Sequence, residues 1–427
     1  MRGFCIVLII LTLTSWSVAQ NYSNSLLNSS QHDFRVVAHQ LIVDSAGKLK
    51  FHIPLVKALE GKIGINGSTQ GDTIYGYLRN EDHYGLTVRF NSFREIRSQK
   101  NYKDAVIQSM DCDQQMIESQ TVNDRYELLA AMHDAEVEMP LMEEYKNNTA
   151  MLSRLFAQEM ELGQIVEVRD FVKLERNHNN AIERLNKMTL QAHENEIKLA
   201  RFYNSGATRN FETHDFITID DIEVRFDSLR FDPTQIPALR CAACNINLAS
   251  AGKQYASAQG REILDALSIG YDNPLYLQRP NKFNTLNNYS LRATFKWPLT
   301  ANNNFRNSRA WLDVLDADYE RSEKEWELRN QYHETRSLIK TLLEQYKEVR
   351  ARQKTGLAYR LLTNTELQKQ ITPHELLELR LLESESRIIL AGLEKNIIEA
   401  YLNLLKICGT TVASPRINEL SHSRSSW

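Results

Sequence analysis

The best-spaced reactive residues in this chain are two cysteines, Cys241 and Cys244, which lie one helical turn apart. A Cys-x-x-Cys pair can form a redox couple or supply half of a metal site. No second pair follows at metal-ligand spacing, and Asn245 rather than a histidine follows Cys244. Both cysteines also lie on a helical stripe with a spacing of three and four residues, where small side chains pack against another helix. We therefore interpret them as packing positions and expect no metal.

The other polar residues give no enzyme pattern. The eleven histidines lack ligand spacing, and neither a glycine-rich phosphate loop nor a nucleophile elbow is present in the sequence. His178 is the one polar member of an apolar helical stripe, and we interpret it as a hydrogen-bonded packing residue. A formal net charge of −3 gives no basic field for nucleic acid. We expect no catalysis, no cofactor and no nucleic-acid partner.

Composition indicates a folded, helix-rich chain. Its 427 residues include only 16 glycines and 9 prolines, so segments without a helix breaker are long. Hydrophobic residues make up 42% of the chain, which is enough for a core. Gly163 and the pair Thr372-Pro373 are expected to mark the tips between long helices, and Gly206 and Gly409 to end the helices that follow.

The first 19 residues are typical of a secretory signal peptide. An apolar run over residues 4–13 precedes Ser17 and Ala19, the small residues of a cleavage site. The run is about ten residues long, half of what a membrane-spanning helix needs. We expect the signal peptide to be cleaved after Ala19 and the chain to be exported. Residues 20–50 are expected to form a weakly ordered lead-in.

The remaining sequence predicts one order of elements twice: two strands, then a long helical hairpin. The first repeat is predicted over 51–232, with strands in 62–92, a hairpin at 94–206 and an inter-repeat segment at 207–232 that has a strand-like patch at 216–224. The second is predicted over 233–420, with a helix at 234–261, strands in 266–298 and a hairpin at 300–408, followed by a tail at 421–427. Tyr84 and Tyr289 are 205 positions apart, as are Asp170 and Glu375, which indicates a duplicated unit.

The clearest strands alternate apolar and polar residues. Such strands fit a transmembrane β-barrel with lipid outside and water inside, where Arg89, Arg292 and Lys296 would face the lumen. The same alternation describes an ordinary half-buried sheet equally well. About four strands in one chain are too few to close a barrel, so closure would need several subunits.

Three segments resemble the TolC-type outer membrane efflux proteins. They are Tyr289-Ser-Leu-Arg-Ala-Thr-Phe-Lys-Trp-Pro-Leu299, Ile371-Thr-Pro-His-Glu-Leu-Leu-Glu-Leu379 and Ala400-Tyr-Leu-Asn-Leu-Leu-Lys-Ile-Cys-Gly409. The duplicated order of elements is similar too. The resemblance implies a mainly α fold with a small β part, in a homotrimer whose 12-stranded barrel in the outer membrane continues as a periplasmic helical tunnel. It also implies two partners, a periplasmic adaptor and an inner-membrane pump.

In that family, acidic side chains near the start of the second repeat's last long helix line the periplasmic aperture. The family pattern matches Glu375-Leu-Leu-Glu378 here, and its first-repeat counterpart begins at Asp170. An alternative for Glu375 is a capping box with Thr372, and Glu378 can be a solvated helix position.

The function that follows from the resemblance is a passive exit duct of an efflux or type I secretion system in the outer membrane. The alternative is an exported periplasmic coiled-coil protein, an adaptor or a scaffold, whose strands form a small soluble sheet.

Overall fold

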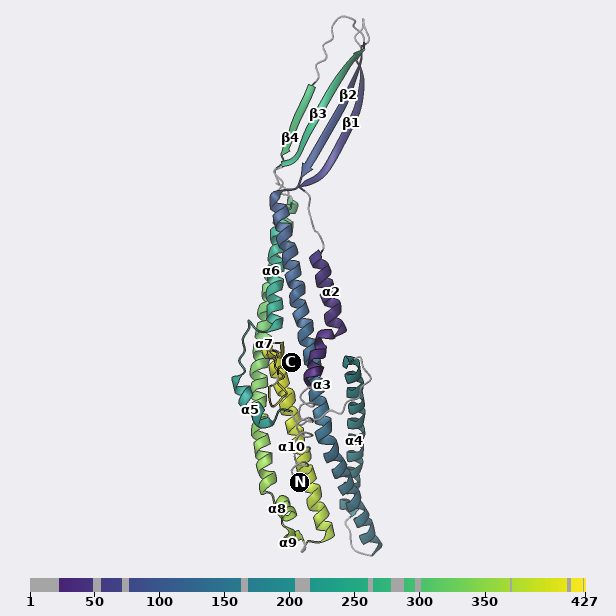
Figure 1. Ribbon diagram of the computed structural model, residues 1–427, viewed down its shortest axis with the longest axis vertical. Coiled ribbons are helices and arrows are strands. Elements are labelled where there is room, and N and C mark those ends of the chain that lie inside the picture. Colours follow the sequence, from purple (N-terminus) through teal and green to yellow (C-terminus); the bar gives the residue numbers. More distant parts are fainter. Residues whose placement is uncertain are drawn as a thin grey trace, which may run out of the picture. The chain divides into compact units, whose positions relative to one another are not determined.

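Figure 1 shows the chain as a computed structural model. The structure describes residues 23–48, 55–70, 77–162, 168–203, 216–259, 264–277, 288–295, 301–368, 371–412, 416–424 and 426–427. The expected signal peptide lies outside the described residues, as do Gly163, Gly206 and Lys296.

Within the described residues, four strands form one antiparallel sheet with the order β1-β2-β3-β4 (Figure 1). They span Val56–Gln70 (β1), Tyr77–Phe90 (β2), Leu264–Leu277 (β3) and Asn288–Phe295 (β4). The central β2–β3 pair joins the first strand pair to the second. The two predicted strand pairs therefore share one sheet.

The first hairpin consists of α3 (Phe93–Glu161) and α4 (Val168–Tyr203). The Ser92 hydroxyl accepts a hydrogen bond from the Glu95 backbone N (3.0 Å), which satisfies one free N–H at the start of α3. The stripe predicted on α4 faces the protein, because Leu174, Ala181 and Met188 are buried. Leu174 packs against Leu152 and Phe156, both of α3.

The second hairpin is less regular than expected. The breaker-poor stretch predicts one helix over 300–371, but the structure has α7 (Ala301–Thr355), α8 (Leu357–Thr363) and α9 (Thr365–Gln368) before α10 (Pro373–Cys408). Gly356 is extended, with φ −62° and ψ 149°. A Cβ at Gly356 would lie 2.9 Å from the Arg352 backbone O, so the break uses the absence of a side chain. The single-helix prediction is wrong there.

The prediction of a strand-like patch at 216–224 is also wrong, because helix α5 (Ile219–Ser228) begins within this segment. Thr218 and Asp221 form a capping box at its start. Ile219, Ile222 and Phe226 are buried at a spacing of three and four. The helical period therefore prevails over the apparent alternation.

Within the lead-in predicted at residues 20–50, the described residues 23–48 contain helix α2 (Phe34–Lys48), which the sequence did not predict. A short 3-10 helix, η1 (Ser29–His32), precedes it. Arg125, 1% exposed, donates to the Ser29 carbonyl O (3.2 Å) and pairs with Asp33 (3.2 Å). These contacts come from α3, so the sequence of the lead-in does not reveal them. Like α6 (Pro237–Ala258) in the second half, α2 precedes a strand pair.

The chain divides into two compact units, and each takes residues from both repeats. One comprises Met1–Gln40, Gln114–Arg240 and Lys324–Trp427, and the other Leu41–Asp113 and Cys241–Glu323. The main core of the first unit includes Tyr126, Ile222, Tyr401 and Leu404, each at most 1% exposed. Leu420, the last residue of the predicted second repeat, also belongs to this core, and Trp427 of the tail packs against it.

Within the described residues, no helix combines the length and the apolar character required to cross a bilayer.

Candidate functional site

The first two turns of α10 carry two of the predicted aperture residues, Glu375 and Glu378. Glu375 completes a capping box: its carboxylate accepts from the Thr372 backbone N (2.9 Å) and hydroxyl (2.8 Å), while the Thr372 hydroxyl accepts from the Glu375 backbone N (3.3 Å). The bonds that Thr372 donates lower the pKa of the Glu375 carboxyl, which therefore stays ionised. Glu375 is exposed, so the capping role leaves its charge accessible to solvent.

Glu378 lies beside a histidine that the sequence analysis did not select. His374 Nε2 is 3.5 Å from Glu378, and His374 Nδ1 is 3.4 Å from Glu159 near the end of α3. The His374 ring also meets Phe156 edge-on, with 4.8 Å between ring centroids. The end of α3 and the start of α10 are therefore neighbours. Only the fold brings together Glu159 and His374, which lie more than two hundred residues apart.

Asp170, the third predicted aperture residue, lies in the first turn of α4 and is exposed. A carboxylate there interacts favourably with the free N–H groups of the helix start. Among the described interactions, none joins Asp170 to Glu375 or Glu378. The structure thus places two of the three residues together, and Asp170 at the equivalent turn of the other hairpin.

The sheet has a polar face that carries the described arginines. Arg89 forms an ion pair with Glu60 on the neighbouring strand (Nε to Oε1, 2.9 Å). Arg292 stands opposite Ser268 in the β3–β4 register and is exposed. The Thr87 and Ser268 hydroxyls lie 3.1 Å apart on the same face. Arg89 and Arg292 therefore share one face, while Lys296 lies outside the described residues.

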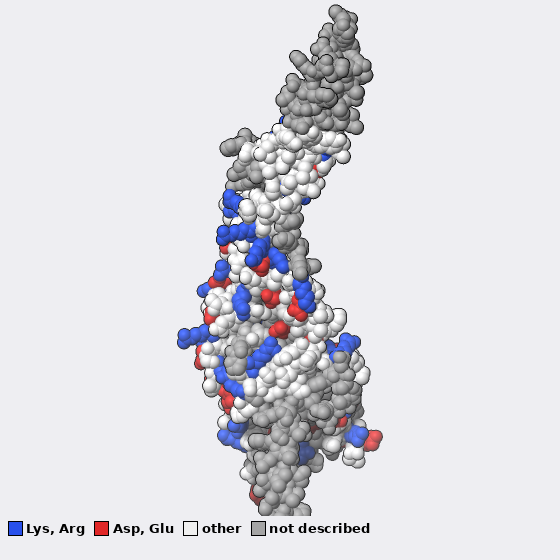
Figure 2. Space-filling model, turned by 45° about the horizontal axis from the view of Figure 1, so that its top comes forward, with Lys and Arg blue, Asp and Glu red and all other residues white. Residues whose placement is uncertain are grey.

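The opposite face of the sheet is apolar and exposed. One row across neighbouring strands consists of Ile63, Tyr84, Tyr271 and Tyr289, and the next consists of Gly61, Leu86, Ile269 and Leu291. Ile63, Tyr289 and Leu291 are each more than 70% exposed. In Figure 2 the described part of the sheet shows few charged residues, whereas charged residues of both signs are scattered over the helices. A face of this kind is unusual on a surface that meets only water.

A cavity of about 560 Å³ opens between α3, α4 and α10 within the first unit. Its acidic and basic lining residues are Glu127, Asp134, Glu138, Glu194, Lys198, Lys395, Glu399 and Lys406. Burial raises the pKa of Asp134 to about 7, although its carboxylate lies 3.8 Å from Lys395 Nζ. No local spacing in the sequence reveals this cluster, because its members come from three helices that are distant in the chain.

The two smaller predictions had different outcomes. The prediction for His178 is confirmed, because its Nδ1 lies 3.0 Å from the Thr149 hydroxyl of α3. The packing-only interpretation of Cys244 is wrong, because Cys244 forms a disulfide with Cys112 of α3. Cys112 is 132 residues away, so no local spacing reveals the pair.

Solved channel structures share this fold. CusC, whose crystal structures concern folding and transmembrane channel formation, is 12% identical, with a TM-score of 0.63 over 91% of this chain and 92% of that one. The outer membrane protein VceC of Vibrio cholerae is 9% identical, with a TM-score of 0.59 over 91% and 96%. The MtrE outer membrane channel of Neisseria gonorrhoeae is 13% identical, with a TM-score of 0.58 over 91% and 88%.

No protein-family model matches the chain, and no curated protein matches it in sequence. The structural likeness nevertheless extends over nearly the whole chain. The fold is therefore that of the TolC-type outer membrane efflux channels, which confirms the resemblance seen in the sequence.

Proposed function

From the fold of a TolC-type outer membrane efflux channel, we propose that this chain is one subunit of a homotrimeric exit duct in the bacterial outer membrane. Substrates would pass through it without catalysis, delivered by a periplasmic adaptor and an inner-membrane pump of an efflux or type I secretion system. The single observation that carries the proposal is a sheet with one exposed apolar face and one polar face, joined to two long helical hairpins. A lipid-facing barrel wall needs this division.

The sheet chemistry supports a membrane location. The row of Tyr84, Tyr271 and Tyr289 gives three neighbouring strands an aromatic residue at one level. Tyrosine favours the boundary between lipid and water, because its ring is apolar and its hydroxyl is polar. The apolar rows beside it would face lipid, and Arg89 and Arg292 would face the aqueous lumen.

The strand count supports three copies. The four strands that the structure describes in one chain are too few for a closed barrel, whereas three chains would supply twelve. Helix α7 also has an exposed apolar stripe at heptad spacing, formed by Phe305, Leu312, Tyr319 and Trp326. Each of these side chains is more than half exposed. A heptad stripe of this type packs against another helix in coiled coils, and we assign it to a neighbouring subunit.

Cell fractionation tests the proposal. The full chain would be expressed in a Gram-negative host, and its membranes separated by density and extracted with detergent. We expect it in the outer membrane fraction, and as a trimer after extraction. Recovery as a periplasmic monomer without detergent would contradict the duct and favour the coiled-coil adaptor or scaffold.

A further inference from the structure

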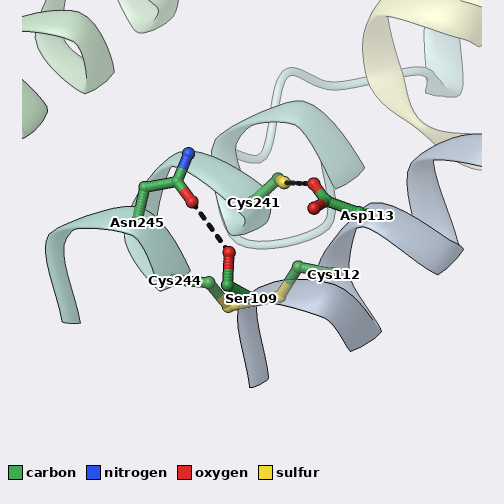
Figure 3. The surroundings of a disulfide bond; sticks show 6 residues. All are labelled: Ser109, Cys112, Asp113, Cys241, Cys244 and Asn245. Atoms are coloured by element: carbon green, nitrogen blue, oxygen red, sulfur yellow. Dashed lines mark hydrogen bonds between the residues drawn. A yellow bond between two sulfur atoms is a disulfide. The ribbon is translucent and has the colours of Figure 1, made fainter. Parts of the chain in front are cut away.

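Helices α3 and α6 share an interface that contains three cysteines and one carboxylate (Figure 3). The helices are antiparallel there, as three contacts show. These are the stacked rings of Tyr102 and Tyr255, the hydrogen bond from Ser109 Oγ to Asn245 Oδ1 (3.1 Å) and the Cys112–Cys244 disulfide. All of them lie within the second unit. The disulfide thus joins the first repeat to the second.

Cys241 lies one helical turn before Cys244 on the same side of α6. Its thiol donates a hydrogen bond to Asp113 Oδ1, with 3.2 Å between sulfur and oxygen. Asp113 directly follows Cys112 on α3. In Figure 3 the two α6 cysteines therefore meet two consecutive α3 residues: Cys244 meets Cys112, and Cys241 meets Asp113.

Cys241 is a free thiol one helical turn from Cys244, and a thiol on the same helix as a disulfide sulfur can exchange with it. The Cys241 thiolate would attack Cys244 Sγ, so that a Cys241–Cys244 bond forms while the Cys112–Cys244 bond breaks. Cys112 would leave as a thiolate and take up a proton. This exchange consumes no oxidant or reductant. Its product joins two residues of one helix and no longer connects α3 to α6.

We propose that Asp113 keeps Cys241 in its thiol form and thereby directs disulfide formation to Cys112 and Cys244. The carboxylate accepts the thiol hydrogen, and its negative charge opposes a second negative charge on the sulfur. Burial, followed by the hydrogen bond and the charge of Asp113, raises the pKa of Cys241 to about 12. Only the thiolate attacks a disulfide, so exchange is suppressed at neutral pH.

The correct pairing matters because the two bonds constrain the chain differently. Cys112 and Cys244 are separated by 132 residues, so their bond closes a long loop and restricts the unfolded chain. A Cys241–Cys244 bond would close a loop of one helical turn and would leave the two helices unconnected. Asp113 is thus a positioning residue for the cross-link, and this role does not depend on the proposed duct.

Re-oxidation of the full-length protein tests the pairing. The detergent-solubilised wild type and Asp113→Asn would be reduced, re-oxidised with glutathione at pH 8, alkylated with iodoacetamide and digested without reduction. Mass spectrometry then gives the amount of each disulfide peptide. Asparagine keeps an acceptor oxygen but removes the charge. We expect nearly all wild-type cross-links to be Cys112–Cys244, and at least about a fivefold rise in Cys241-containing cross-links in Asp113→Asn.

The control is Ser109→Ala, which removes the neighbouring α3–α6 hydrogen bond without changing the charge near Cys241. It should retain the wild-type distribution. Equal distributions in Asp113→Asn and the wild type would overturn the proposal, as would wild-type protein in which Cys241 is the cross-linked residue.

A second measurement needs no refolding. In the native, oxidised wild type, iodoacetamide should alkylate Cys241 about 100-fold more slowly at pH 8 than it alkylates free cysteine, because the raised pKa leaves little thiolate. Asp113→Asn should react at least about fivefold faster than the wild type, and Ser109→Ala at the wild-type rate. After denaturation all three should react alike. A wild-type rate for native Asp113→Asn would show that Asp113 does not protect Cys241.

Discussion

At the residue scale, Glu375 has a structural role and remains available for an electrostatic one. Its side chain caps α10 through Thr372, yet its carboxylate stays exposed and ionised. Glu378 adds a second exposed carboxylate one turn later. Three copies of this pair around an axis would attract cations and repel anions. The capping explanation and the aperture explanation are therefore compatible.

Conductance measurements can separate the two roles. In Glu375→Gln combined with Glu378→Gln, glutamine can still complete the capping box, so the helix start is kept while the charge is lost. In planar bilayers we expect the cation-over-anion permeability ratio to fall at least about twofold. The control, Thr372→Ala, removes the cap but keeps the charge, so it should lower stability and leave selectivity unchanged. If the permeability ratio of the double variant were unchanged, Glu375 and Glu378 would have only structural roles.

Because of the raised pKa of Asp134, we expect the stability of the folded chain to depend on pH. Its pKa is about 7 in the folded chain and about 3.9 when unfolded, so folding favours the protonated form. The contribution of the protonated carboxyl to the free energy of unfolding is complete below about pH 4. It declines as pH rises and is lost above about pH 7. Asp134→Asn should therefore raise the melting temperature by a few degrees at pH 8 and leave it nearly unchanged at pH 4.

Circular dichroism of the detergent-solubilised protein measures this difference. Glu127→Gln, an exposed carboxylate of the same cavity, is the matched control and should show no such pH dependence. If Asp134→Asn had the same effect at both pH values, burial of the charge would not be the cause.

At the element scale, the end of α10 depends on a glycine. Gly409 has φ +70°, in the left-handed region, and its N–H bonds to carbonyls of the last turn. A Cβ there would lie 2.8 Å from Pro237 Cδ and 3.0 Å from the Gln235 carbonyl O. The same residue thus stops the helix and allows the segment before α6 to pack closely.

Gly409→Ala should destabilise the protein by about 1–3 kcal/mol, because the left-handed conformation and the contact with Pro237 both oppose a side chain. Gly392→Ala is a control in the same helix, since no atom lies within 4 Å of its Cβ position. That change should be neutral or stabilising by up to about 1 kcal/mol. Thermal unfolding followed by circular dichroism would compare the two. Similar melting temperatures would contradict the role given to Gly409.

At the scale of the whole molecule, two surfaces indicate a partner for this chain: the apolar face of the sheet and the heptad stripe on α7. Their exposed residues are too large and too regularly spaced to be scattered surface positions. Under the proposed function, lipid would cover the first surface and a second copy of the chain would cover the second. Membrane insertion and assembly would then each bury one surface.

Substitution within the stripe tests assembly. Leu312→Glu combined with Tyr319→Glu places charges in the expected helix–helix contact, so trimers should fall to less than about half of the extracted protein. Light scattering after size-exclusion chromatography in detergent gives the fractions. Arg321→Glu, an exposed α7 position outside the stripe, should remain trimeric. A stable trimer of the double variant would place the contact elsewhere.

The sequence by itself determined the features that depend on near neighbours. The alternation around Tyr84 and Tyr289 identified two strands, because side chains of a strand alternate between faces. The capping box at Thr372 and the stop at Gly409 set the ends of α10, since their partners lie within a few residues. The duplicated order of these elements was enough to identify the fold.

Tertiary structure decided the features whose partners are far apart in the chain. Helix α2 follows a segment that is held by hydrogen bonds from Arg125 of α3. Cys244 forms a disulfide with Cys112, which lies 132 residues away. The cavity that contains Asp134 is formed by three helices. The helical form of α5 also depended on burial of one face. Local spacing has no information about such contacts, because burial, disulfide pairing and charge clustering exist only after distant segments have packed together.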